Sequence, residues 1–136
     1  MSELTYLDGI AAGGYQPGAC NIGPAEVRRR RMAGHAGMLA SAGLLAGLVL
    51  LGAPPMARLL IVAPAAVSAS GYLQAHMRFC ANYGWRGIFN VGEIGDDAEV
   101  VDRTARAADR RLALRIGLGS LALGVAAGIL AVLLPI

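Results

Sequence analysis

Lysine is absent from this sequence, in which all twelve basic residues are arginine. Its absence excludes a P-loop lysine, a Schiff-base lysine and a serine–lysine catalytic dyad. Charged residues account for only 15% of the chain, against roughly 25% in ordinary soluble domains. A Gly-x-Ser-x-Gly nucleophile elbow is missing as well. These absences argue against a soluble, nucleotide-dependent enzyme.

Hydrophobic residues, by contrast, make up 56% of the 136 residues, and the mean hydropathy is +0.55. The charges gather in blocks and leave three long stretches nearly free of them, at about 32–51, 56–74 and 112–134. A helix of about 20 residues is about 30 Å long, which matches the hydrocarbon core of a bilayer. We therefore expect an all-α integral membrane protein, with three transmembrane helices in one domain over 24–136.

Glycine and proline mark the expected ends of these helices. Gly23-Pro24 predicts a helix start, and Gly52–Pro55 predicts a tight turn after the first span. Pro64 should kink the second span, whose helix is expected to continue past the membrane to a glycine-rich loop at 84–97. The third helix should begin near Asp96-Asp97, a plausible N-cap pair, and extend from the cytoplasm into the third span.

Arginine placement sets the expected orientation. All arginines except Arg58 lie within 24–32 and 75–115, on one side of a three-span arrangement. The positive-inside rule then places the N-terminal segment 1–23 and the loop 75–111 in the cytoplasm, and the C-terminus outside. We expect the protein in the inner (cytoplasmic) membrane, with Arg58 snorkelling to the outer interface. An interfacial aromatic belt is expected from Tyr72, Phe79, Tyr83, Trp85 and Phe89.

Three segments carry a resemblance to known proteins. They are Cys20–Glu26 (Cys-Asn-Ile-Gly-Pro-Ala-Glu), Gln74–Cys80, and Gly87–Asn90 (Gly-Ile-Phe-Asn). They resemble a group of small bacterial three-span membrane proteins, and the resemblance extends over most of the chain. It implies the three-span topology and transfers no functional residue to this sequence.

Two stripes of small residues predict contacts between helices. In the third span, Gly117, Ser120, Gly124 and Gly128 follow i, i+3, i+7, i+11 spacing and therefore line one face. The first span carries a similar stripe of Ala36, Ala40, Gly43 and Gly47. Such residues let two backbones approach closely in lipid, either within one chain or between protomers. Because three helices bury little of their own surface, we expect a homo-oligomer or a subunit of a larger membrane complex.

The charged segment before the third span has a pattern of its own. Small and apolar residues alternate at steps of three and four, at Ala98, Val101, Ala105, Ala108 and Leu112. On another face, Asp102 and Arg106 have the i, i+4 spacing of a helical ion pair. We expect this stretch to be a helix docked on another helix, with a solvated juxtamembrane helix as the alternative.

Arg28, Arg29, Arg30 and Arg31 form a basic block beside the first span. The block determines topology, and it could also attract anionic lipid at about 1 kcal/mol per residue. It is short and lies against the membrane, which argues against a nucleic-acid partner.

Two cysteines and two histidines form a candidate metal site. His76 and Cys80 share one helical face, His35 begins the first span at a similar depth, and Cys20 lies in the adjacent segment. A Cys2His2 set suits zinc, nearby methionines would favour copper(I), and the two histidines could bracket a haem. A Cys20–Cys80 disulfide is disfavoured on the reducing side of the membrane.

The cores of the three spans lack acids and bases, which argues against a proton-coupled transporter or a channel with a charged filter. The leading hypothesis is a non-enzymatic membrane scaffold or accessory subunit that self-associates or joins a larger complex. A metal- or haem-binding redox protein and a small oligomeric transporter or pore are the alternatives.

Overall fold

The structure is a computed structural model, and it describes residues 14–136. Its elements are α2 (Pro24–Leu50), the 3-10 helix η1 (Pro55–Ile61), α3 (Val62–Met77), α4 (Ala81–Arg86), β1 (Ile88–Phe89), β2 (Ala98–Glu99) and α5 (Arg103–Leu133). Three stretches are long and apolar enough to cross a membrane: Pro24–Leu50, Pro55–Met77 and Arg103–Leu133. The chain is therefore mostly helical, as expected. It also contains a small antiparallel β1–β2 pair that the sequence did not predict.

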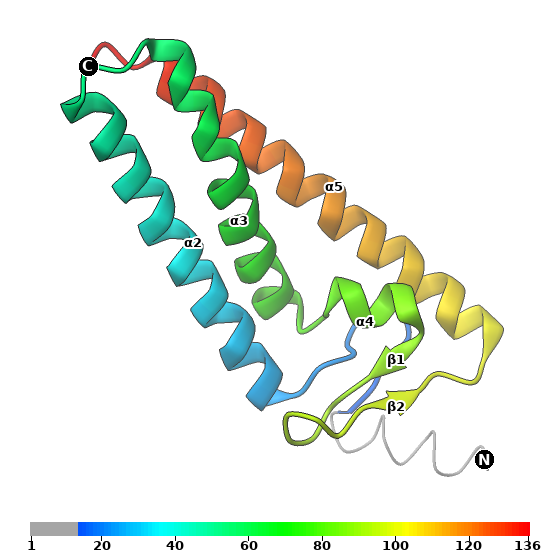
Figure 1. The fold of residues 1–136 in the computed structure, drawn as a ribbon. Coiled ribbons are helices and arrows are strands. Elements are labelled where there is room, and N and C mark those ends of the chain that lie inside the picture. Colours follow the sequence, from blue (N-terminus) through cyan, green and yellow to red (C-terminus); the bar gives the residue numbers. More distant parts are fainter. Residues whose placement is uncertain (1–13) are drawn as a thin grey trace.

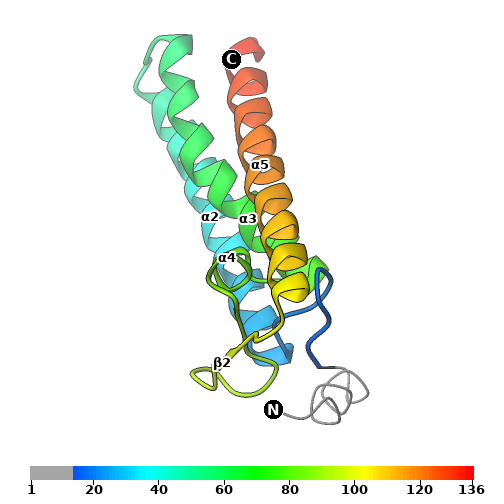
Figure 2. The same ribbon diagram turned by 90° about the vertical axis from the view of Figure 1, so that its right-hand side faces the viewer.

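The long helices run side by side, and α3 contacts both α2 and α5 (Figure 1). The two short strands, α4 and residues 14–23 gather at one end (Figures 1 and 2). We call this end the base and define it as residues 14–31 and 73–116. Residues 32–72 and 117–136 form the arms, which extend from the base and end near the turn between α2 and η1.

Glycine and proline end the helices much as expected. Pro24 occupies the first turn of α2, where its missing N–H would have no intrahelical partner. After Leu50, Gly52 adopts a left-handed φ of +68°, and prolines follow. Pro64 falls in the first turn of α3, where proline is tolerated, and the irregularity of this span is the 3-10 segment that precedes it.

The second long helix ends earlier than the sequence suggested. α3 stops at Met77, because Arg78 adopts a left-handed conformation with φ +53°. The N–H of Phe79 then donates to the carbonyl of Gln74, and the Phe79 ring is completely buried. Phe79 packs in a cluster with Leu112 and Ile116 of α5, so the chain leaves the helix to bury this ring.

The third long helix begins later than expected, at Arg103, and Asp96-Asp97 is not its N-cap. Asp102 caps it instead, accepting a hydrogen bond from the N–H of Ala105 at 3.0 Å. The residues before it are extended because Ala98–Glu99 pairs with Ile88–Phe89. Asp102 therefore does not form the expected ion pair with Arg106, whose guanidinium donates to the carbonyl of Val100.

The expected seam of alternating residues is interrupted for the same reason. Ala98 belongs to β2 and Val101 is 73% exposed, whereas Ala105 and Leu112 are buried. The aromatic residues expected to form a belt are divided: Trp85 is 57% exposed, whereas others are internal. Phe79 and Tyr83 are buried in the base, and Phe89 stacks on Tyr15 with ring centroids 4.6 Å apart. These rings build the core of the base.

Candidate functional site

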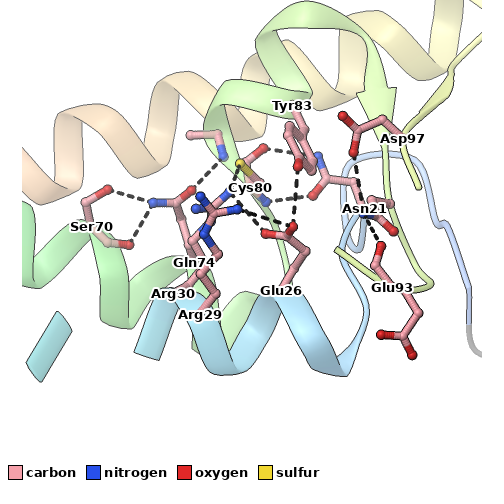
Figure 3. A network of polar contacts seen from close by, with 12 residues as sticks. Asn21, Glu26, Arg29, Arg30, Ser70, Gln74, Cys80, Tyr83, Glu93 and Asp97 are labelled. Atoms are coloured by element: carbon pink, nitrogen blue, oxygen red, sulfur yellow. Dashed lines mark hydrogen bonds and ion pairs between the residues drawn. The ribbon is translucent and has the colours of Figure 1, made fainter. Parts of the chain in front are cut away.

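Asn21 joins the N-terminal segment to the connection between α3 and α4 (Figure 3). Its side-chain oxygen accepts from the N–H of Cys80 at 2.6 Å, and its amide donates to the Cys80 carbonyl at 3.1 Å. Its own backbone N–H donates to the carbonyl of Arg78. Asn21 is fully buried. The Asn21 side chain thus replaces the backbone acceptor that the N–H of Cys80 loses where the helix is broken, and adds a second donor to the Cys80 carbonyl, which also accepts from the N–H of Gly84.

Asn90 extends this connection to the loop between the strands. Its backbone N–H donates to the Asn21 carbonyl at 2.8 Å, and its carbonyl accepts from Gly23 at 2.9 Å. Its side-chain amide donates to the carbonyl of Glu93 at 2.7 Å. The segments Cys20–Glu26, Gln74–Cys80 and Gly87–Asn90 therefore meet in the base, although they are far apart in the sequence.

Glu26 is a buried carboxylate held by neighbours on its own helix and on α4 (Figure 3). Arg30 lies 3.5 Å from one carboxylate oxygen and Arg29 lies 3.8 Å from the other. The Tyr83 hydroxyl donates to Glu26 at 3.4 Å. Burial, together with the negative charge of Glu26, raises the pKa of Tyr83, so its phenol remains protonated and able to donate.

Arg30 connects this carboxylate to Cys80. Its guanidinium donates to the Cys80 sulfur at 2.9 Å and lies 5.8 Å from the centroid of the Tyr83 ring. Cys80 itself is only 1% exposed. Glu26 and Cys80 are closed off from solvent, and Arg30 is directed at both of them, which suits structural support better than catalysis.

Asp109 is a second buried acid, and the sequence reasoning missed it. It accepts from the Tyr15 hydroxyl at 2.6 Å and from the backbone N–H of Gly18 at 2.7 Å. These bonds fasten the N-terminal segment to α5. A signal existed in the sequence, because Asp109 continues the buried i, i+3, i+7 stripe of Leu112 and Ile116. No pattern in the sequence could have identified Asn21, since its side chain bonds main-chain groups of a distant segment. The side chain of Asn90 bonds locally, to Gly92 and Glu93, and only its backbone groups reach distant segments.

The four predicted metal ligands are not brought to a common point. His35 pairs with the Tyr72 hydroxyl at 2.6 Å, and His76 is exposed on α3. The Cys20 thiol contacts the Ile22 carbonyl at 3.5 Å, while Cys80 contacts Arg30. Burial raises the pKa of Cys20, which disfavours the thiolate that a metal would need. Within residues 14–136, no three His, Cys, Asp or Glu side chains gather as metal ligands, so the Cys2His2 arrangement is not found.

The stripe on the third span lies largely in the contact with α3. Ser120, Gly124 and Gly128 are buried, whereas Gly117 is exposed. A Cβ at Gly124 would lie 2.7 Å from the Cβ of Ala66, and one at Gly128 would lie 2.4 Å from a methyl of Val62. Glycine is needed at both positions for the helices to approach so closely.

The stripe on the first span does not make the contact between α2 and α3. Gly34 and Gly37 make it, facing Tyr72 and Ser68, and a Cβ at Gly71 would lie 2.5 Å from the backbone nitrogen of Gly34. The predicted residues lie on another side of the helix: Ala36, Ala40, Gly43 and Gly47. Ala36, Ala40 and Gly43 are exposed, and nothing lies within 4 Å of a Cβ placed at Gly43 or Gly47.

Arg58 does not extend to the surface as expected. It is only 4% exposed, and its guanidinium donates to the carbonyls of Ala131 and Leu134 at 3.0 Å, as well as to that of Ile136. The last carbonyls of a helix lack intrahelical donors and carry partial negative charge. Arg58 therefore caps the C-terminal end of α5 at the far end of the arms.

The arginine block divides into two pairs. Arg29 and Arg30 contact Glu26, whereas Arg28 and Arg31 line a cavity of about 610 Å³ together with Arg78 and Cys20.

Comparisons with protein-family models, curated proteins and solved structures give no match. The resemblance to small bacterial three-span proteins therefore stays an expectation, and the function is argued from the geometry alone.

Proposed function

We propose that this protein is a non-enzymatic membrane scaffold or accessory subunit that binds another transmembrane helix through the outer face of α2. The observation that carries the proposal is the open surface around Gly43 and Gly47. In the most apolar 18-residue stretch of α2, 11% of the residues are buried, against 28% in the corresponding stretch of α5. A helix with small residues on a free face can pair closely in lipid. The simplest occupant is α2 of a second copy.

The state of the polar groups in the base supports a structural role. Glu26, Cys80 and Asp109 are buried and each is bonded to other parts of the chain. A catalytic group needs access to a substrate, which none of these three has. The base would therefore serve to hold the helices in register and present α2.

A pair of isoleucine variants tests the association. Gly43→Ile places a branched side chain on the proposed face, while Gly117→Ile places the same side chain on an exposed position of α5. We expect the first variant to lower the mass of the detergent-solubilised species and the second to leave it unchanged. Equal masses for both variants and the native protein, at unaltered thermal stability, would refute association through this face.

We further propose that the base lies in the cytoplasm and that the membrane is the inner membrane. The support is the distribution of arginine, because Arg58 alone lies away from the base. An impermeant maleimide should leave Glu93→Cys unlabelled in intact cells and label Leu51→Cys, with Cys20 replaced by alanine in both. Both reporter positions are exposed. Labelling of the Glu93→Cys variant alone would show that the base lies on the outer side of the membrane, which would contradict the proposed orientation.

A further inference from the structure

The cavity beside the first turn of α2 has an unbalanced charge. Of the ten residues that line it, three are arginine (Arg28, Arg31 and Arg78), and none is acidic. Val27 and Val91 contribute apolar wall. A hollow of about 610 Å³ is within the size range of small-molecule sites. Its lining is therefore suited to an anion that also carries apolar or neutral groups.

Among the described residues, the three arginines differ from their neighbours in having no anionic partner. Within residues 14–136, no hydrogen bond or ion pair is formed by the side chains of Arg28, Arg31 or Arg78. Arg29 and Arg30, in the same block, share the single carboxylate of Glu26. Glu26, the acid of the first turn, thus pairs on the side of α2 away from the cavity arginines. Their positive charge is therefore not compensated by this carboxylate.

The cavity arginines are positioned by rigid parts of the fold. Arg28 and Arg31 are one helical turn apart on α2. Arg78 ends α3 with a left-handed backbone, and its carbonyl accepts from the N–H groups of Asn21 and Ile22 at 3.1 and 3.4 Å. Guanidinium groups bind phosphate oxygens in a bidentate manner, and the positive end of α2 adds to the attraction. The chemistry of the lining therefore selects a phosphate group.

The position of the cavity favours a lipid as the source of that phosphate. Arg31 is followed directly by Met32, which is 65% exposed and begins the charge-free stretch of α2. If α2 spans the bilayer, the cavity lies at the level of the head groups. We propose that Arg28, Arg31 and Arg78 bind the phosphate of an anionic phospholipid head group in this cavity.

The test compares neighbouring arginines that change the net charge equally. Native mass spectrometry would measure how tightly the detergent-purified protein retains phosphatidylglycerol, with phosphatidylcholine as the reference lipid. Arg28→Gln and Arg78→Gln should each weaken retention about tenfold or more, the loss expected for a hydrogen bond between charged groups. Arg29→Gln removes the same charge beside the cavity and should weaken retention by no more than about fivefold, the loss expected for a diffuse attraction. Melting temperatures establish that each variant is folded.

Two results would overturn the proposal. Equal losses for Arg28→Gln and Arg29→Gln would mean a diffuse attraction of the whole basic block instead of a site. Binding of soluble glycerol phosphate as tight as that of the lipid would assign the cavity to a free anion. If Arg28→Gln fails to fold, Arg31→Gln and Arg78→Gln against Arg29→Gln give the same comparison. Lipid retention is independent of helix association, so the Gly43→Ile result does not decide it.

Discussion

The base and the arms of this molecule are held together by different interactions. In the base, four polar residues are completely buried and bonded to distant segments: Asn21, Glu26, Asn90 and Asp109. In the arms, the helices meet chiefly through glycines that allow close backbone contact, as at Gly37 and Gly124. Lipid offers helices no hydrophobic driving force to associate, so close packing replaces it there. The comparison indicates that the base specifies the fold and the arms adapt it to the membrane.

Removing one polar side chain from the base should have the largest effect. Asn21→Ala leaves the N–H of Cys80 without a partner in a buried place and removes one of the two donors to its carbonyl, which keeps the N–H of Gly84. An unsatisfied buried group costs about 1–3 kcal/mol and the second lost hydrogen bond about 1 kcal/mol, so we expect a loss of about 3 kcal/mol in the free energy of unfolding. Denaturant unfolding in detergent would measure it. Asn82→Ala, at an exposed position of α4, is the control. A similar small change in both would contradict the role of the base.

Adding one methyl group to the arms should cost less. Gly124→Ala introduces a Cβ 2.7 Å from the Cβ of Ala66 and 2.8 Å from the carbonyl oxygen of Val62. Overpacking of this kind costs about 1–3 kcal/mol, and we expect about 2 kcal/mol. Gly117→Ala, with open space around it, should be neutral or stabilising because alanine favours helix. Thermal unfolding of the two variants would measure the difference in stability between a substitution on the face of α5 that contacts α3 and one on its free face.

Arg58 is the buried charged residue of the arms. Arg58→Met keeps an unbranched side chain but leaves the carbonyls of Ala131 and Leu134 uncapped. We expect a loss of about 1 kcal/mol, seen mainly as faster amide hydrogen exchange in the last turn of α5. Arg115→Met, on the exposed side of the same helix, controls for the lost charge. Unchanged exchange at residues 130–134 would show that the cap is dispensable.

The smallest effect expected concerns the two thiols. Because burial raises the pKa of Cys20, its thiolate fraction at neutral pH is below that of an ordinary cysteine. Maleimide labelling of Cys20 should therefore be slow near pH 7 and accelerate only at higher pH. Cys80, which is 1% exposed, should label only on unfolding. Rapid labelling of Cys80 in the folded protein would mean that the base opens readily.

The arms could be anticipated from the sequence and the base could not. Charge-free stretches and proline positions gave the three long helices, because these are local properties of composition and length. The sequence did not show which face of α2 contacts α3, since its glycine at position 34 and its alanine at position 36 are equally compatible with a small-residue stripe. Which one faces α3 depends on the hairpin geometry.

In the base, local signals competed with long-range contacts. Asp96-Asp97 looked like an N-cap, but the pairing of Ala98–Glu99 with Ile88–Phe89 delays the helix to Arg103. The Cys2His2 arrangement is not found among residues 14–136 for a similar reason. His76 and Cys80 would share a helical face only if α3 continued beyond Met77, and the left-handed Arg78 ends it. No glycine or proline lies at Arg78 or between Ala98 and Arg103, so the sequence indicates neither the early end of α3 nor the late start of α5.

Amide hydrogen exchange of the native protein tests the central claim most directly. The N–H groups of Asn21, Gly23, Cys80 and Asn90 lie outside the long helices and are bonded only between distant segments. If these contacts specify the fold, peptides covering residues 20–23 and 88–90 should exchange as slowly as α3. Exchange as fast as in the exposed turn at 92–97 would show that the base is not a stable polar assembly, and would contradict the account.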